Sequence, residues 1–141
     1  MWRGNLLNED ERIRNFSKDV KKINKLFKSL KQKKIIKKFY VFPYTKSFLK
    51  VSKKYKVFDG ACIYRNPIEN EYEKLISKFK KFKFIASRPF GGNLKLAKKH
   101  NLKYLLNYYN NNKKISKVIL ACSKKKQIKE IVSYCDGKKS F

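Results

Sequence analysis

The chain has 141 residues, of which 42% are hydrophobic and 15% aromatic, and this composition predicts one folded domain rather than a disordered polypeptide. Its 38 Lys and Arg residues outnumber 10 Asp and Glu residues, which gives a formal net charge of +28. Such a charge predicts non-specific binding to polyanions at low salt. No apolar run approaches the roughly 20 residues that span a bilayer, so we expect no membrane role.

The few cysteines and the single histidine predict neither a metal cluster nor a disulfide framework. Cys62, Cys122 and Cys135 lack a Cys-x-x-Cys spacing, and His100 stands alone. We interpret Cys62 and Cys122 as small buried hydrophobic residues of a reducing compartment. The N-terminal residues carry no hydrophobic segment of a secretory signal, so we expect a cytoplasmic protein without a bound metal.

The first 16 residues are polar, and we expect them to form an extended lead-in, followed by one domain over residues 17–141. Ser17 is a candidate N-cap of a helix that ends near Gln32. Its apolar residues recur at helical spacing. They are Val20, Ile23, Phe27 and Leu30.

Two strands and two helices are expected next. Residues 39–42 favour a strand that Pro43 ends, and Thr45 can cap a short helix. The apolar run 61–64 predicts a strand buried in a sheet. Asn66 followed by proline indicates the start of a second helix, whose apolar stripe extends to residue 79.

A third strand over residues 82–86 runs into a glycine-containing loop, residues 87–93, and Asn93 can cap the helix that follows. Free backbone N–H groups and the helix dipole would make this loop suitable for an anion at the carboxyl end of a parallel strand. An ordinary turn between a strand and a helix is the alternative.

The last part of the chain predicts one more helix–strand–helix unit. Asn101 is a candidate cap of a helix that ends near Tyr109, and residues 118–122 predict a fully apolar strand. Ser123 is the expected cap of the final helix. The expected buried face of that helix consists of Ile128, Ile131, Val132 and Cys135. Strand and helix thus alternate four times after a leading helix, which predicts an α/β fold with a parallel sheet.

The order of these elements resembles the C-terminal half of an aldo-keto reductase, from about residue 20 to residue 132. The resemblance rests on four segments taken together. They are Tyr40-Val41-Phe42-Pro43-Tyr44, Ile63-Tyr64-Arg65-Asn66, Ala86-Ser87-Arg88-Pro89-Phe90-Gly91-Gly92, and Ile119-Leu120-Ala121-Cys122-Ser123 with Gln127-Ile128-Lys129-Glu130. It implies about four βα units of parallel sheet, a partial (half) TIM-type (β/α)8 barrel preceded by a helix.

Members of that family reduce carbonyls with NAD(P)H, bound across the carboxyl ends of the last strands. By position, the residues that would line the pyrophosphate and nicotinamide are Ser87, Arg88, Pro89, Phe90, Gly91, Gly92 and Asn93. Those near the adenosine phosphate would be Cys122, Ser123, Lys124 and Gln127. Cys62 falls where the family often has a glutamine that holds the carboxamide. The resemblance implies NADP(H), with NAD(H) as the alternative.

Two departures from the family pattern change the functional expectation. Phe42 and Pro43 stand where the family has Ser-Asn, which removes hydrogen-bonding groups for the carboxamide. The family's catalytic Tyr, Lys, Asp and His belong to the first half of the barrel, and the resemblance does not extend to that half. We therefore expect an aldo-keto reductase-like protein that is inactive alone and keeps the cofactor-binding half. It would pair with an N-terminal half-barrel partner or associate with itself.

The alternative hypothesis is a lysine-rich α/β module that binds nucleic acid. It requires basic side chains gathered on one surface. The candidate groups are Lys33, Lys34, Lys37 and Lys38 together with Lys124, Lys125 and Lys126. Arginine, which suits bidentate recognition of bases and phosphates, occurs at only five positions, so sequence-specific recognition is the weaker form of this hypothesis.

Overall fold

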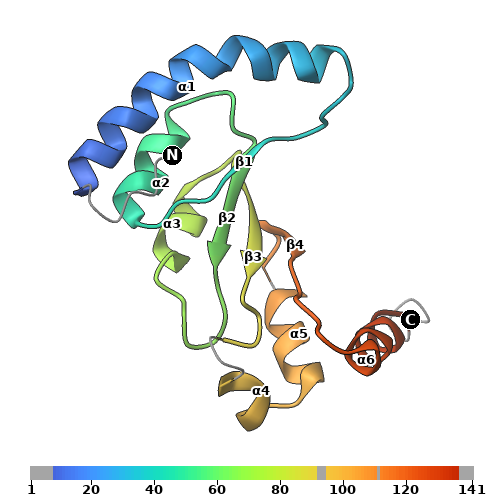
Figure 1. Ribbon diagram of the computed structural model, residues 1–141. Coiled ribbons are helices and arrows are strands. Elements are labelled where there is room, and N and C mark those ends of the chain that lie inside the picture. Colours follow the sequence, from blue (N-terminus) through green and yellow to red (C-terminus); the bar gives the residue numbers. More distant parts are fainter. Residues whose placement is uncertain (1–7, 92–94, 111, 137–141) are drawn as a thin grey trace.

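The computed structural model describes residues 8–91, 95–110 and 112–136 (Figure 1). Its centre is a four-stranded sheet in which the strands follow one another in chain order and all pairs are parallel. The strands are β1 (Tyr40–Val41), β2 (Gly60–Tyr64), β3 (Lys83–Ser87) and β4 (Ile115–Val118). The helices are α1 (Glu9–Gln32), α2 (Lys46–Lys53), α3 (Glu73–Lys78), α4 (Lys95–Lys99), α5 (Leu102–Asn110) and α6 (Lys125–Asp136). The predicted α/β class and parallel sheet are confirmed.

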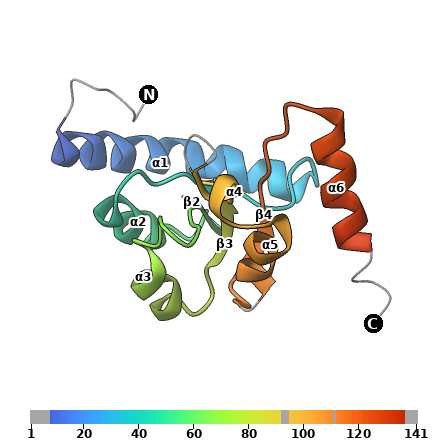
Figure 2. The ribbon, with the colours of Figure 1, turned by 90° about the horizontal axis from the view of Figure 1, so that it is seen from below.

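Alternate residues of the strands form the core on one face of the sheet. Ala61, Ile63 and Phe84 are fully buried, in one cluster with apolar residues of α1, α2 and α3. Figure 2 shows α2, α3 and α5 on one side of the sheet, with α1 crossing behind the strands near their amino ends. The intervening residues Cys62 and Ile85 are only half-buried. The two faces of the sheet are therefore covered unequally, and β1 and β4 are its outer strands.

The first helix begins earlier than expected. Asn8 is its N-cap: the Asn8 side chain accepts a hydrogen bond from the N–H of Glu11, whose carboxylate accepts one from the N–H of Asn8. This capping box satisfies two helix-terminal donors, so the expected extended lead-in is wrong from residue 9 onward. Residues 1–7 lie outside the described residues. The end of the helix at Gln32 is confirmed.

Of three other predicted helix starts, two are confirmed and one is wrong. Thr45 accepts a hydrogen bond from the N–H of Phe48 as the N-cap of α2, and Asn101 accepts one from Tyr104 at the start of α5. Both predicted caps are confirmed. Helix α3, in contrast, begins at Glu73 and not directly after Asn66. Asn66 instead holds a turn by accepting hydrogen bonds from the N–H groups of two residues that follow it.

The C-terminal unit differs most from expectation. Strand β4 ends at Val118 because its pairing with β3 ends at Ala86, so most of the apolar run 118–122 lies beyond the sheet. Helix α6 has no buried residue among those described, and Ile128 and Val132 are each 50% exposed. The expected buried face of this helix is therefore wrong. No described helix is long and apolar enough to cross a membrane.

Candidate functional site at the carboxyl edge of the sheet

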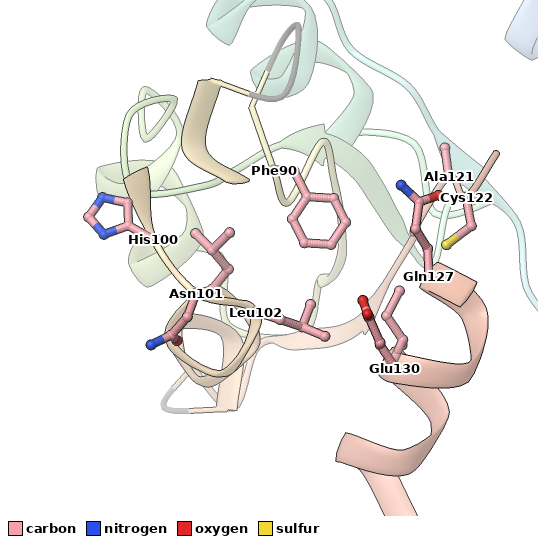
Figure 3. Close-up of a pocket in the computed structure, with 10 residues that line it drawn as sticks. Phe90, His100, Asn101, Leu102, Ala121, Cys122, Gln127 and Glu130 are labelled. Carbon is pink, nitrogen blue, oxygen red and sulfur yellow. The ribbon is translucent and has the colours of Figure 1, made fainter. Parts of the chain in front are cut away.

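A cavity of about 260 Å³ opens where the chain leaves β3 and β4 (Figure 3). One wall is Phe90, from the loop after β3, together with the residues that begin α5. The other wall is the segment after β4 and the first turns of α6. The lining residues are Phe90, His100, Asn101, Leu102, Leu105, Ala121, Cys122, Gln127, Glu130 and Ile131. Because all strands are parallel, these segments meet at the carboxyl edge of the sheet, the usual place for a ligand in an open α/β protein.

The loop after β3 is fixed by backbone conformations that few residues adopt. Arg88 has a φ of 57° and Gly91 has a φ of 72°, both in the left-handed region. Glycine pays no steric cost there, whereas arginine does. The Gly91 N–H donates to the Arg88 carbonyl at 3.0 Å, which closes the turn. The loop thereby brings Phe90 to the cavity.

The start of α6 forms the second wall, and two backbone N–H groups there already have a hydrogen-bond acceptor. The Gln127 side-chain oxygen Oε1 accepts hydrogen bonds from the N–H groups of Ser123 and Lys124, at 3.0 Å and 3.1 Å. An anion at this helix start would have to displace the Gln127 amide. Ser123 was expected to cap the helix through its side chain; the helix begins at Lys125, and the side chain of Gln127 satisfies the N–H groups instead.

A second group of expected site residues lies around the end of β2 and not in the cavity. The Arg88 guanidinium stacks 4.1 Å from the Tyr64 ring centroid and its Nη1 lies 3.3 Å from the Glu69 carboxylate. The Phe42 ring meets Tyr64 edge-on at 5.2 Å. Aromatic rings and a guanidinium thus occupy the place that the resemblance assigns to polar carboxamide ligands.

Cys62 belongs to this second group. Burial raises the pKa of its thiol, and a hydrogen bond with the Ser87 side chain partly offsets that effect. The Ser87 hydroxyl also donates to the Ile63 carbonyl at 3.1 Å, which ties β3 to β2. A thiol with a raised pKa is a poor nucleophile.

The structure therefore brings together only some of the expected site residues. Phe90, Cys122 and Gln127 line the cavity. Pro89 and Gly91 shape the loop beside it, and Ser123 and Lys124 are exposed at the start of α6 outside the lining. Cys62, Ser87 and Arg88 surround the end of β2. Gly92 and Asn93 lie outside the described residues.

Sequence reasoning missed several residues of the cavity. Glu130 follows Gln127 by three residues on α6, a spacing that puts both on one helix face, so this residue could have been found from the helix pattern. His100 could not, because it enters the lining through the fold around the start of α5. There its ring stacks on Tyr104 with centroids 4.6 Å apart.

The cavity combines an apolar surface with a few polar groups. Apolar side chains form most of its surface, and the Asn101 and Gln127 amides and the Glu130 carboxylate supply polar groups. Such a combination orients a flat, partly polar ligand. Within residues 8–91, 95–110 and 112–136, no three His, Cys, Asp or Glu side chains lie close enough together to hold a metal ion.

Comparison with known proteins adds no family assignment. No protein-family model, no curated protein and no solved structure matches the chain.

Proposed function

We propose that the chain is an aldo-keto reductase-like βα protein that binds the adenosine end of a nicotinamide dinucleotide and is not catalytic alone. The observation that carries this proposal is the cavity at the carboxyl edge, between the loop after β3 and the start of α6. The resemblance assigns the cofactor to these same two segments. The four-stranded parallel sheet is consistent with half of a (β/α)8 barrel.

The lining residues suit an adenine ring. Phe90, Leu102 and Ile131 offer apolar surface to the faces of a flat base. The Gln127 amide nitrogen can donate a hydrogen bond to a ring nitrogen of the base. A pyrophosphate would then extend toward the start of α6, where it would compete with Gln127 for the backbone N–H groups.

The charges around the cavity favour NAD(H) over NADP(H). Glu130 is part of the lining, whereas Lys124 is exposed outside it. A carboxylate beside the ribose repels a 2′-phosphate and can accept a hydrogen bond from a 2′-hydroxyl group. We expect the substitution Glu130→Lys to shift the preference toward NADP(H).

The nicotinamide end lacks the groups that hydride transfer would require. The rings of Phe42 and Tyr64 and the guanidinium of Arg88 pack together at the end of β2, where the resemblance would place the ligands of the carboxamide. We therefore expect no turnover of NAD(P)H with simple aldehydes by the chain alone.

A partner that supplies further βα units completes the proposal. Parallel sheets are normally covered on both faces, and here one face carries half-buried side chains such as Cys62, Tyr64 and Ile85. The outer edges of β1 and β4 are open to further strands. An N-terminal half-barrel chain could fill both positions, and a second copy of this chain is the alternative occupant.

Thermal unfolding in the presence of nucleotides tests cofactor binding. A ligand with a Kd of about 100 μM, present at about 1 mM, stabilises the folded state by about 1.4 kcal/mol, which raises Tm by about 4 °C. We expect NAD and AMP to give this shift and nicotinamide mononucleotide to give none. Leu102→Trp, which fills the cavity, should abolish the shift. Ile128→Trp, on an exposed position of α6, is the matched control. Identical Tm values with and without NAD would reject the proposal.

The lysine clusters named for the nucleic-acid alternative do not come together. Lys33, Lys34, Lys37 and Lys38 precede β1, whereas the group at residues 124–126 follows β4. In a parallel sheet these positions belong to opposite edges, and Figure 1 shows them far apart. These two groups of lysines therefore do not form the single basic surface that the nucleic-acid hypothesis requires.

A further inference from the structure

We propose that the outer face of α1 binds the phosphate backbone of a nucleic-acid duplex without reading its sequence. Five basic residues of α1 form what we call the basic stripe: Arg14, Lys18, Lys21, Lys25 and Lys28. At 3.6 residues per turn they fall within an arc of about 80°, and all five are exposed. This surface differs from the clusters considered above and is independent of the cofactor proposal.

No ion pair among the described residues neutralises the basic stripe. The three ion pairs of the described residues join Lys31 to Asp59, Arg65 to Glu73 and Arg88 to Glu69, and none involves the stripe. Asp10 precedes the stripe in the first turn, and Asp19 is turned about 100° from Lys18 around the helix axis. Within the part of the chain that the structure describes, a continuous row of cations without a carboxylate partner thus faces solvent.

The other face of α1 is already used by the core, which argues against a membrane surface as the ligand. Phe16 and Val20 are buried, and the Phe27 ring stacks on Phe39 with centroids 3.7 Å apart. A helix that lies in a membrane interface needs its apolar face free to enter the lipid. Leu26 is exposed on the outer side, at 55%, but one leucine does not form such a face.

The shape and composition of the stripe favour a duplex over a single strand. From Arg14 to Lys28 the stripe is about 21 Å long, which equals the rise of about six base pairs. It contains no aromatic side chain on which unpaired bases could stack. Four of its five cations are lysines, which act as point charges and do not make the bidentate contacts that distinguish bases. Figure 1 shows α1 along the outer boundary of the molecule, where a rod-like ligand can approach it.

The test compares two variants of equal net charge in binding to a fluorescent DNA duplex of about 24 base pairs, over a salt series from about 25 to 200 mM. The stripe variant carries Lys18→Gln, Lys21→Gln, Lys25→Gln and Lys28→Gln. The control variant carries Lys46→Gln, Lys54→Gln, Lys56→Gln and Lys74→Gln, at exposed positions outside α1. Glutamine and lysine have similar helix propensities, and circular dichroism checks that both variants fold.

Each lysine that contacts a phosphate adds about 0.9 to the steepness of log K against log salt. We expect the stripe variant to lose about 3.6 units of that slope and to bind more than about tenfold more weakly at 50 mM salt. The control variant should stay close to the unmodified chain. Equal weakening of both variants would show diffuse attraction and overturn the proposal. So would a lack of duplex binding at about 50 mM salt, or an effect of the stripe variant on phosphatidylserine vesicles alone.

Discussion

The side-chain amide of Asn66 donates a hydrogen bond of 2.9 Å to the backbone carbonyl of Arg88, 22 residues later in the chain. This contact joins the segments that follow β2 and β3. Asn66 is fully buried, and its Oδ1 also accepts hydrogen bonds from the N–H groups of Ile68 and Glu69. One side chain thereby holds a turn and the left-handed Arg88 at the start of the loop that lines the cavity.

We expect Asn66→Ala to destabilise the fold by about 3 kcal/mol, because a buried carbonyl and two N–H groups lose their partner together. Urea unfolding measures the change in the free energy of unfolding. Asn70→Ala, at an exposed position of the same connection, is the control and should stay within about 0.5 kcal/mol of the unmodified chain. Equal stability of the two variants would contradict a structural role of the Asn66 amide.

Asp59 gives a second prediction, in which the two partners of one ion pair behave differently. Its Oδ2 accepts a hydrogen bond from Lys31 at 2.6 Å and another from the backbone N–H of Phe39 at 2.7 Å. Asp59→Ala should cost about 2 kcal/mol because the backbone donor is left without its acceptor. Lys31→Met should cost less than about 1 kcal/mol, as for other partly exposed ion pairs. Chemical denaturation of both variants checks this, and a larger loss for Lys31→Met would reverse the assignment.

The raised pKa of Tyr72 predicts that the folded state loses stability at alkaline pH. Burial, with a smaller effect of nearby Glu71, raises the pKa of its phenol to about 12. The folded state therefore keeps this proton at pH values where the unfolded chain has lost it. Stability contributed by Tyr72 is complete below the unfolded pKa of about 10 and decreases as the pH rises toward 12.

The substitution Tyr72→Phe isolates this effect from the titration of the lysines. It removes the ionisable group together with the hydrogen bond that the Tyr72 hydroxyl donates to the Pro43 carbonyl at 3.3 Å. The stability advantage of the unmodified chain over the variant should shrink between about pH 10 and pH 12. Unfolding free energies across that range provide the measurement, and a constant difference would show that the phenol does not titrate with unfolding.

The parts of the fold that the sequence predicted correctly depend on local patterns. Thr45 and Asn101 cap their helices through contacts with residues three positions away. The apolar run at residues 61–64 lies in β2 because its neighbours on both sides are strands. The Asn8 capping box is equally local. The spacing of Asn8 and Glu11 could have predicted this helix start, but the many charged residues around it favoured an extended segment instead.

The expectations that failed depend on contacts between distant segments. Asn66 with the proline after it is a good local helix start, yet its amide reaches the Arg88 carbonyl instead. The apolar run after Val118 has strand composition, but its pairing with β3 ends where the Ile119 N–H donates to the Ala86 carbonyl. The two walls of the cavity were predicted separately from their sequences. That both walls meet the start of α5 in one cavity could be seen only in the three-dimensional fold.

Helix α6 supplies the last prediction, because its apolar stripe is not used by the described core. Ile128 and Val132 are four residues apart on one face and each is 50% exposed. The double substitution Ile128→Gln with Val132→Gln should therefore change the free energy of unfolding by less than about 1 kcal/mol. Ile76→Ala, at a position in α3 that is 1% exposed, should cost about 3 kcal/mol in the same urea experiment. If the double variant lost as much stability as Ile76→Ala, α6 would have to pack against apolar surface in solution. The prediction that this helix has a buried face would then be correct.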